Sequence, residues 1–333
     1  WSLKKHAKFK FLKSNLGLRG EALCFPFFYF LLNDNSHIPF TCFAVTLRKT
    51  FKMRKIVLPT DFSENAFDAL KYAAELFKYE RSELFLLHAY ADEVFEQAGD
   101  TRENLELLKA EAKQKTEQEL DRIKTRILEI FPNPKHEFKT VSAFGLLIDE
   151  VNDLAERENA DLIVTSTRGV SNDRKLTFGS NSLQIIKYVQ CPVLSIPANY
   201  HFRDLKKILL PSNFMLPYQR RELKLLGDLA RSLCAEINLV YISKFPQETL
   251  RQRENKSAAL EQFYKIKVTE HLEKLNDKAE AIQKLIPELN IDLLVLVNSR
   301  HSYLENLLYT STIDKIGFDP KIPFLVLQNF YRL

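Results

Sequence analysis

The chain of 333 residues carries one pattern of short apolar runs twice. Residues 55–62 read K-I-V-L-P-T-D-F and residues 207–214 read K-I-L-L-P-S-N-F, which is an offset of 152. Two later matches, 160–164 with 291–295 and 191–194 with 322–325, share an offset of 131. The chain is therefore a tandem duplication, and its second copy lacks 21 residues between the first and fourth apolar runs.

In the first copy, apolar runs of strand length alternate with longer segments of helical periodicity. The expected strands are 54–59, 84–88, 137–141, 162–165 and 193–196. The expected helices begin at Ser63 and cover about 101–130, 146–156 and 180–189. Continuous apolar strands separated by helices indicate a parallel sheet that is covered on both faces. The predicted fold class is α/β, with two tandem doubly wound, Rossmann-like, five-stranded parallel-sheet domains, of which the second is degenerate.

The second copy repeats this order in a shorter form. Its expected strands are 206–210, 237–242, 266–270, 293–297 and 324–327, and its expected helices are 217–233, a shorter one within 247–263, 278–289 and one near Ser311. We expect most of the missing 21 residues in the helix after the second strand. The predicted domains are 53–198 and 203–330, with the linker near His201 to Arg203.

Residues 1–52 differ from the remainder in charge and in pattern. They contain nine Lys or Arg and two acidic residues, so the rest of the chain carries a net charge of −2 within a total of +5. The apolar run 22–32 contains Pro26 and is too short to span a bilayer. We interpret 1–52 as a non-native or disordered extension ahead of a natural start at Met53; a targeting segment and an apolar interaction arm are the alternatives.

Charge and cysteine usage exclude some functional classes for the remainder of the chain. A near-neutral balance is not the basic face that nucleic-acid binding requires. Only Cys191 and Cys234 lie after residue 52, both in apolar contexts typical of buried thiols, so neither a disulfide scaffold nor a metal site is indicated. We expect a cytoplasmic protein that binds neither membrane nor nucleic acid.

The loops after the first and fourth strands are the expected ligand site, because doubly wound sheets bind ligands beyond the carboxyl ends of their strands. The fourth strand is followed by Ser166-Thr167-Arg168-Gly169, nine residues, and Gly179-Ser180-Asn181 at a helix start. Glycine allows a phosphate to approach the backbone, and the free N–H groups of the helix start attract anions. A tight turn with a helix cap is the alternative reading of these residues.

This loop, together with V-L-P-T-D-F-S at 57–63 and C-P-V-L at 191–194, resembles the universal stress protein family. The resemblance covers Met53 to Ala198 and, more weakly, Leu205 to Gln328, and it departs from the family's loop where Ser166 replaces the first glycine. It implies an ATP site in the first domain, with ATP bound alone or with Mg²⁺. By this resemblance, Asp61 contacts the adenine, the backbone of Ala89 contacts the base edge, and Pro59 and Thr60 shape the pocket. The phosphates are then held by the loop and helix start, at Ser166, Gly169, Gly179, Ser180 and Asn181.

Two of the polar residues near this site have structural interpretations as well. Asp61 is a possible helix cap after the first strand, which is a common use of Asp. His88 ends a buried strand, and no acidic partner for it is evident in the sequence, so we interpret it as a structural histidine rather than a catalytic one.

The second copy lacks the features that would hold a phosphate. Arg300 stands at the position of Gly169, Thr310 at that of Gly179, and Asn213 at that of Asp61. We predict that this copy does not bind nucleotide in the family's way. Its expected role is structural, as the partner of the first copy in an intramolecular pseudo-dimer joined through 193–196 and 324–327; a homodimer of the whole chain is left open.

Two functions fit these observations. The first is a stress-response regulator that binds ATP in its first domain with little or no hydrolysis. The second is an interaction or scaffold protein of the same fold that binds no nucleotide, which Ser166 and the decay of the second copy favour. Enzyme classes with other loops are excluded, because the chain contains neither a P-loop nor G-x-G-x-x-G, and 59–63 is not the S-G-G-x-D-S loop of ATP-dependent hydrolases of related fold.

Overall fold

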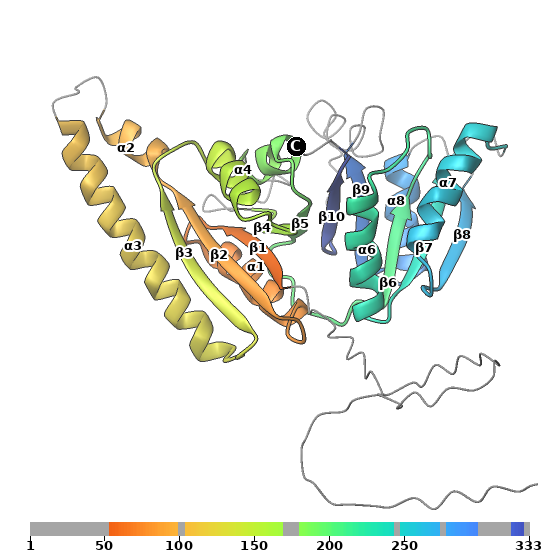
Figure 1. Ribbon diagram of the computed structural model, residues 1–333, viewed down its shortest axis with the longest axis horizontal. Helices are drawn as coiled ribbons and strands as arrows, with labels where there is room; N and C mark the ends of the chain where they lie inside the picture. The colour runs from red at the N-terminus through yellow and green to blue at the C-terminus, as the bar shows by residue number, and fades with distance from the viewer. Residues whose placement is uncertain are drawn as a thin grey trace, which may run out of the picture. The chain divides into compact units, whose positions relative to one another are not determined.

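The computed structural model describes residues 53–98, 104–168, 180–242, 247–273, 278–298 and 321–329 (Figure 1). The predicted extension at 1–52 lies outside these residues. The first repeat consists of β1 (Arg54–Pro59), α1 (Glu64–Leu76), β2 (Ser82–Ala89), α2 (Ala91–Ala98), α3 (Leu105–Ile130), β3 (His136–Ala143), α4 (Leu147–Arg157), β4 (Leu162–Ser166), α5 (Ser180–Tyr188) and β5 (Val193–Ile196). The second consists of β6 (Lys207–Pro211), α6 (Arg220–Ser232), β7 (Glu236–Ile242), α7 (Leu250–Gln262), β8 (Val268–Glu273), α8 (Lys278–Glu288), β9 (Leu293–Asn298) and β10 (Phe324–Gln328).

The strands form one ten-stranded sheet in the order β3-β2-β1-β4-β5-β10-β9-β6-β7-β8. Every pair within a repeat is parallel, and the two repeats join where β5 and β10 run antiparallel, with Leu194 opposite Leu325. Each repeat therefore has the strand order 3-2-1-4-5. Successive strands are added on one side of the first strand up to the third and on its other side from the fourth, so the strand order reverses between the first and fourth strands. This confirms the predicted doubly wound α/β fold and the pairing of the terminal strands.

Alternate strand residues supply two apolar cores, one on each face of the sheet. In β1, Ile56 and Leu58 pack with α1, α3, α6 and α7 against one face. Val57 faces the opposite core, where α4, α5 and α8 pack. Burying a Leu, Ile or Val side chain contributes roughly 1.5–3 kcal/mol, so both faces of the sheet need their helical layers.

The first helix shows how the local sequence sets an element boundary. The Ser63 hydroxyl accepts a hydrogen bond from the Ala66 N–H at 3.2 Å, and the Ser63 backbone is extended, as in an N-cap. Glu64 places a negative charge in the first turn, where the helix dipole favours it.

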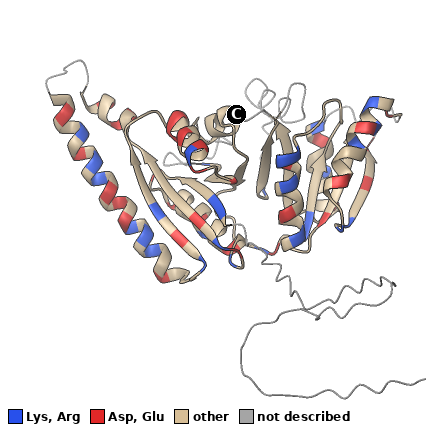
Figure 2. Ribbon diagram, viewed as in Figure 1, with Lys and Arg blue, Asp and Glu red and all other residues tan. Residues whose placement is uncertain are grey.

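The long helix α3 lies alongside β3 with one narrow buried stripe (Figure 1). Thr116, Leu120, Ile123 and Ile127 are buried, whereas Leu105, Leu108 and Ala112 nearer the N-terminus of the helix are only partly buried. Lys, Arg, Asp and Glu alternate along the rest of this helix (Figure 2). This distribution is typical of a helix whose remaining surface faces solvent.

Two features of the connections differ from or refine the sequence-based expectation. Helix α2 was not predicted, and it follows β2 almost directly. Helices α2 and α3 contain 8 and 26 residues, whereas their counterpart in the second repeat, α7, contains 13. The length difference between the repeats is therefore located after the second strand, as predicted.

The duplication is also visible in individual hydrogen bonds. The Lys55 N–H donates to Asp161 Oδ2 at 3.1 Å, and the Lys207 N–H donates to Asp292 Oδ2 at 2.9 Å. In each repeat, an aspartate just before the fourth strand thus fastens the start of the first strand. This equivalence supports the residue-by-residue comparison of the two repeats below.

Candidate functional site

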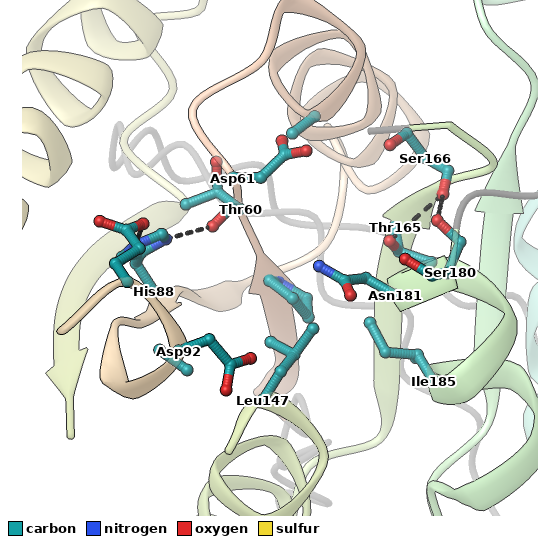
Figure 3. Close-up of a pocket in the computed structure, with 15 residues that line it drawn as sticks. Thr60, Asp61, His88, Asp92, Leu147, Thr165, Ser166, Ser180, Asn181 and Ile185 are labelled. Atoms are coloured by element: carbon teal, nitrogen blue, oxygen red, sulfur yellow. Dashed lines mark hydrogen bonds and ion pairs between the residues drawn. The ribbon is translucent and has the colours of Figure 1, made fainter. Parts of the chain in front are cut away.

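A cavity of about 290 Å³ lies at the carboxyl ends of β1, β2 and β4, beside the N-terminus of α5 (Figure 3). This is the point where the strand order reverses, the usual ligand position of doubly wound sheets. The described site residues predicted from the sequence all line it, namely Pro59, Thr60, Asp61, Ala89, Ser166, Ser180 and Asn181. Gly169 and Gly179 lie outside the described residues.

The turn after β1 is fixed by its own side chains. Thr60 Oγ1 accepts a hydrogen bond from the Phe62 N–H at 3.1 Å, and Phe62 has a positive φ of 61°. Asp61 Oδ1 accepts from the Ser63 N–H at 3.1 Å and from the Ser63 hydroxyl at 2.6 Å. The alternative that Asp61 is the cap of α1 is therefore wrong, because Ser63 occupies that position and Asp61 orients Ser63.

His88 connects this turn to α2. Its Nδ1 lies 2.7 Å from the Thr60 carbonyl oxygen, and its Nε2 lies 2.9 Å from Glu93 Oε1. The centroid of the ring also lies 4.3 Å from that of the Phe62 ring, with the two planes tilted by 38°, and His88 is only 6% exposed. The absence of an acidic partner, inferred from the sequence, is wrong: Glu93 is that partner, five residues downstream on the helix that was not predicted. An H-x-x-x-x-E spacing across a strand-to-helix turn was the signal available.

On the opposite side of the cavity, serine side chains stabilise the end of β4. The Ser182 hydroxyl donates to the Ser166 carbonyl at 2.8 Å, which attaches the first turn of α5 to the strand. The Ser166 hydroxyl donates to the Arg168 carbonyl at 2.7 Å. The serine that replaces glycine therefore directs its hydroxyl to its own loop, while Ser180 and Asn181 begin α5 at the cavity wall (Figure 3).

The cavity wall combines apolar surface with acidic groups. Pro59, Ala66, Leu147 and Ile185 supply the apolar part. The charged side chains of the described lining are the carboxyl groups of Asp61, Asp92 and Glu93, and this part of the lining contains no Lys or Arg. Positive potential within the described wall therefore comes from the N-terminus of α5.

In the second repeat, side chains of α7 and Tyr218 hold the turn after β6 by hydrogen bonds. Ser212, the counterpart of Thr60, shares a hydrogen bond with the hydroxyl of Tyr218. Burial raises the pKa of Tyr218 to about 12. From α7, Gln252 Nε2 donates to the Asn213 carbonyl and Asn255 Nδ2 donates to the Phe214 carbonyl, each at 2.8 Å. Arg300 and Thr310 lie outside the described residues, so the predicted loss of a phosphate loop there stays a prediction.

The comparisons with known proteins agree with this geometry. The family model described as the universal stress protein family matches residues 52–197. The chain is 30% identical over 144 residues to the universal stress protein MJ0531 of Methanocaldococcus jannaschii, which covers 43% of this chain and 81% of that protein. The chain belongs to the universal stress protein family. A second family member of that organism, MJ0577, is 26% identical over 152 residues, covering 43% of this chain and 94% of that protein.

A solved structure extends the likeness in fold to both repeats. The universal stress protein from Archaeoglobus fulgidus DSM 4304 covers 84% of this chain and is itself covered completely, with a TM-score of 0.64 and 19% identity. Another member of the family therefore shares the tandem fold of the present chain. Within the described residues, no helix is long and apolar enough to cross a membrane, and no group of three or more His, Cys, Asp and Glu side chains forms a metal cluster.

Proposed function

We propose that the first repeat binds an adenine nucleotide, with ATP as the expected ligand, and that the chain acts as a stress-response regulator. The observation that carries this proposal is the convergence of the seven described site residues, drawn from four separate segments, on one cavity at the strand-order reversal. We assign the site to a domain spanning 53–198 and a structural role to a domain spanning 203–330.

The chemistry of the wall fits a nucleotide placed in one direction. An aromatic base fits between Pro59, Leu147 and Ile185, and the backbone of Ala89 presents polar groups to its edge. Asp61 contacts the adenine, as the family resemblance implies, and Asp92 accepts hydrogen bonds from ribose hydroxyls. Phosphates then lie over the N-terminus of α5, at Ser180 and Asn181, where N–H groups of the first turn have no partner within the helix.

The same orientation explains why we expect little or no hydrolysis. His88 and Asp92 lie on the β2 side of the cavity, whereas Ser166 and Ser180 lie on the opposite side (Figure 3). A general base must reach the water that attacks the terminal phosphate. His88 and Asp92 are thus at the base and ribose end rather than at the phosphate end. Any Mg²⁺ would bind together with the phosphates.

The cytoplasmic location of the protein stays a prediction that rests on its cysteine usage.

A second function is favoured by the charge of the cavity. The described wall contains three carboxyl groups and no Lys or Arg. The carboxylates repel a polyanion, which favours an interaction protein of the same fold that binds no nucleotide. The two functions differ in one measurable property, which is the affinity of the full chain for ATP.

Substitution of Ser180 tests the proposal. Ser180→Glu places a carboxylate in the first turn of α5, where the helix dipole stabilises it but a phosphate must lie. We expect calorimetric ATP affinity to fall at least about tenfold, which is about 1.4 kcal/mol, while adenosine binding changes less than about twofold.

Ser180→Gln is the matched control, because it has the size of the glutamate without its charge. It is expected to keep ATP affinity within about threefold of the parent chain. Equal losses in both variants would contradict the placement of phosphate at α5. No ATP binding by the parent chain up to millimolar concentration would reject the nucleotide-binding proposal and support the interaction protein.

A further inference from the structure

The ring of His88 faces a hydrogen-bond acceptor at each of its two nitrogens. The Thr60 carbonyl oxygen lies 2.7 Å from Nδ1, and Glu93 Oε1 lies 2.9 Å from Nε2. A carbonyl oxygen can only accept, and an ionised carboxylate can only accept, whereas a neutral imidazole has a single N–H. With Glu93 ionised, both contacts are hydrogen bonds together only when both ring nitrogens carry protons.

We propose that His88 is a doubly protonated positioning residue that holds the β1–α1 turn against α2 and makes ligand binding at this cavity depend on one proton. The proposal rests on the proposed nucleotide site, which it provides with a means of regulation. His88 acts through Thr60 and Asp61, because the carbonyl it binds belongs to the turn whose next residue carries the Asp61 carboxylate.

The surroundings of His88 support a charged ring. The charged groups that face the cavity with it are Asp61 from the β1–α1 turn and Asp92 and Glu93 from α2, with no Lys or Arg in the described wall. From the neighbouring strand, β3, Ser142 lies opposite His88 in register, and α4 contributes Leu147 to the cavity wall. The His88 side chain is 8% exposed and that of Glu93 is 45% exposed. The pair is therefore anchored inside the wall and open to proton exchange on the α2 side.

Loss of the proton has a defined structural consequence. The remaining lone pair then faces either the Thr60 carbonyl or the Glu93 carboxylate, so one of the two hydrogen bonds is replaced by repulsion. The turn that carries Asp61 loses its attachment to α2, and the wall loses its positive charge. Both effects weaken the binding of an adenine nucleotide, so affinity falls as the pH rises.

In the second repeat, the equivalent turn is held without a charged side chain. The strand registers Ile56 with Leu84 and Ile208 with Ile237 place Tyr241 at the position of His88. There the turn is held by the neutral amide of Gln252, which donates to the Asn213 carbonyl at 2.8 Å. A titratable side chain thus holds the turn in the repeat whose described residues form the candidate ligand cavity, and a neutral amide holds it in the second repeat.

Nitrogen chemical shifts and binding titrations on the full chain test the proposal separately. The ¹⁵N resonances of the His88 ring, assigned by their loss in His88→Gln, distinguish a doubly protonated ring from either neutral tautomer. Adenosine and AMP are titrated by calorimetry at about pH 6 and about pH 8 in the parent chain, His88→Gln and Glu93→Gln. Adenosine matters because it has no phosphate that titrates in this range.

Glu96→Gln is the matched control, since it removes a carboxylate from the exposed face of the same helix. We expect doubly protonated shifts at about pH 6 and a smaller protonated fraction in Glu93→Gln at equal pH. Adenosine affinity of the parent chain and of Glu96→Gln should fall at least about threefold from about pH 6 to about pH 8, and this slope should vanish in His88→Gln and Glu93→Gln.

Two results would overturn the proposal. A neutral ring at about pH 6 would reject the proton assignment, and a pH slope that persists in both His88→Gln and Glu93→Gln would reject the linkage. If neither ligand binds at any pH, the proposed nucleotide site fails and the linkage fails with it, whereas the nitrogen shifts still decide the protonation of His88.

Discussion

At the scale of single residues, the two repeats keep the same backbone turn and change what surrounds it. Phe62 and Phe214 both have positive φ, at 61° and 48°, and each N–H donates at 3.1 Å to the hydroxyl two residues earlier, on Thr60 or Ser212. Such a φ is costly for a phenylalanine, so its retention shows that the turn is maintained by its hydrogen bonds. What differs is the neighbour of the hydroxyl residue, which is His88 in one repeat and Tyr218 in the other.

A histidine far from the cavity gives a pH prediction at this scale. Burial lowers the pKa of His136, whose Nε2 lies 3.1 Å from the Phe77 carbonyl at the start of β3. Because the folded-state pKa is below that of the unfolded chain, protons favour the unfolded state. The stability contribution is complete above the unfolded pKa and is lost as the pH falls below it. The free energy of unfolding, measured with urea, should therefore fall more on acidification in the parent chain than in His136→Gln. An equal fall in both would contradict this account.

At the scale of elements, the sequence predicted what depends on local apolar runs and missed what depends on short polar segments. Strand β5 was predicted with its observed bounds, Val193–Ile196, because four consecutive apolar or small residues follow a Cys-Pro pair. Helix α2 was missed because its eight residues bury only Ala91 and Val94, too few to give a periodic signal. Without α2, Glu93 had no position, so the partner of His88 was also missed.

At the seam between the repeats, where β5 pairs with β10, the buried side chain of Gln328 bonds to both repeats. Gln328 at the end of β10 is fully buried, its Nε2 donates to the Ile186 carbonyl of α5 at 3.0 Å, and its Oε1 accepts from Asn298 Nδ2 at 2.8 Å. Gln328→Ala leaves the buried Ile186 carbonyl and the part-buried Asn298 amide without this partner, and we expect it to reduce the free energy of unfolding by about 2–4 kcal/mol. Urea denaturation measures this loss.

Gln184→Ala on the exposed face of α5 is the control for this substitution. It should change the free energy of unfolding by less than about 0.5 kcal/mol. An equally small effect of Gln328→Ala would show that the described contacts of Gln328 do not stabilise the seam.

At the scale of the whole molecule, the duplication divides structural and binding roles between similar repeats. The antiparallel β5–β10 pair makes one continuous sheet from two parallel ones, so the edges that would otherwise be exposed cover each other. The fold and the position of the cavity could be predicted from sequence, because they follow from strand order and from loops after β1 and β4. The loop at 169–179 could be assigned only by resemblance. The hydrogen bonds of Tyr218 and Gln252 to the turn of the second repeat are tertiary contacts that no local pattern encodes.

The stoichiometry of ATP binding to the full chain tests the central claim most directly. Isothermal titration with Mg-ATP should give one site per chain, because the first repeat has the cavity and the second repeat has its turn closed by its own side chains. Ser180→Glu should lower the affinity for Mg-ATP in the same titration. Two sites per chain would contradict the division of roles between the repeats, and no binding at millimolar ATP would contradict the nucleotide site itself.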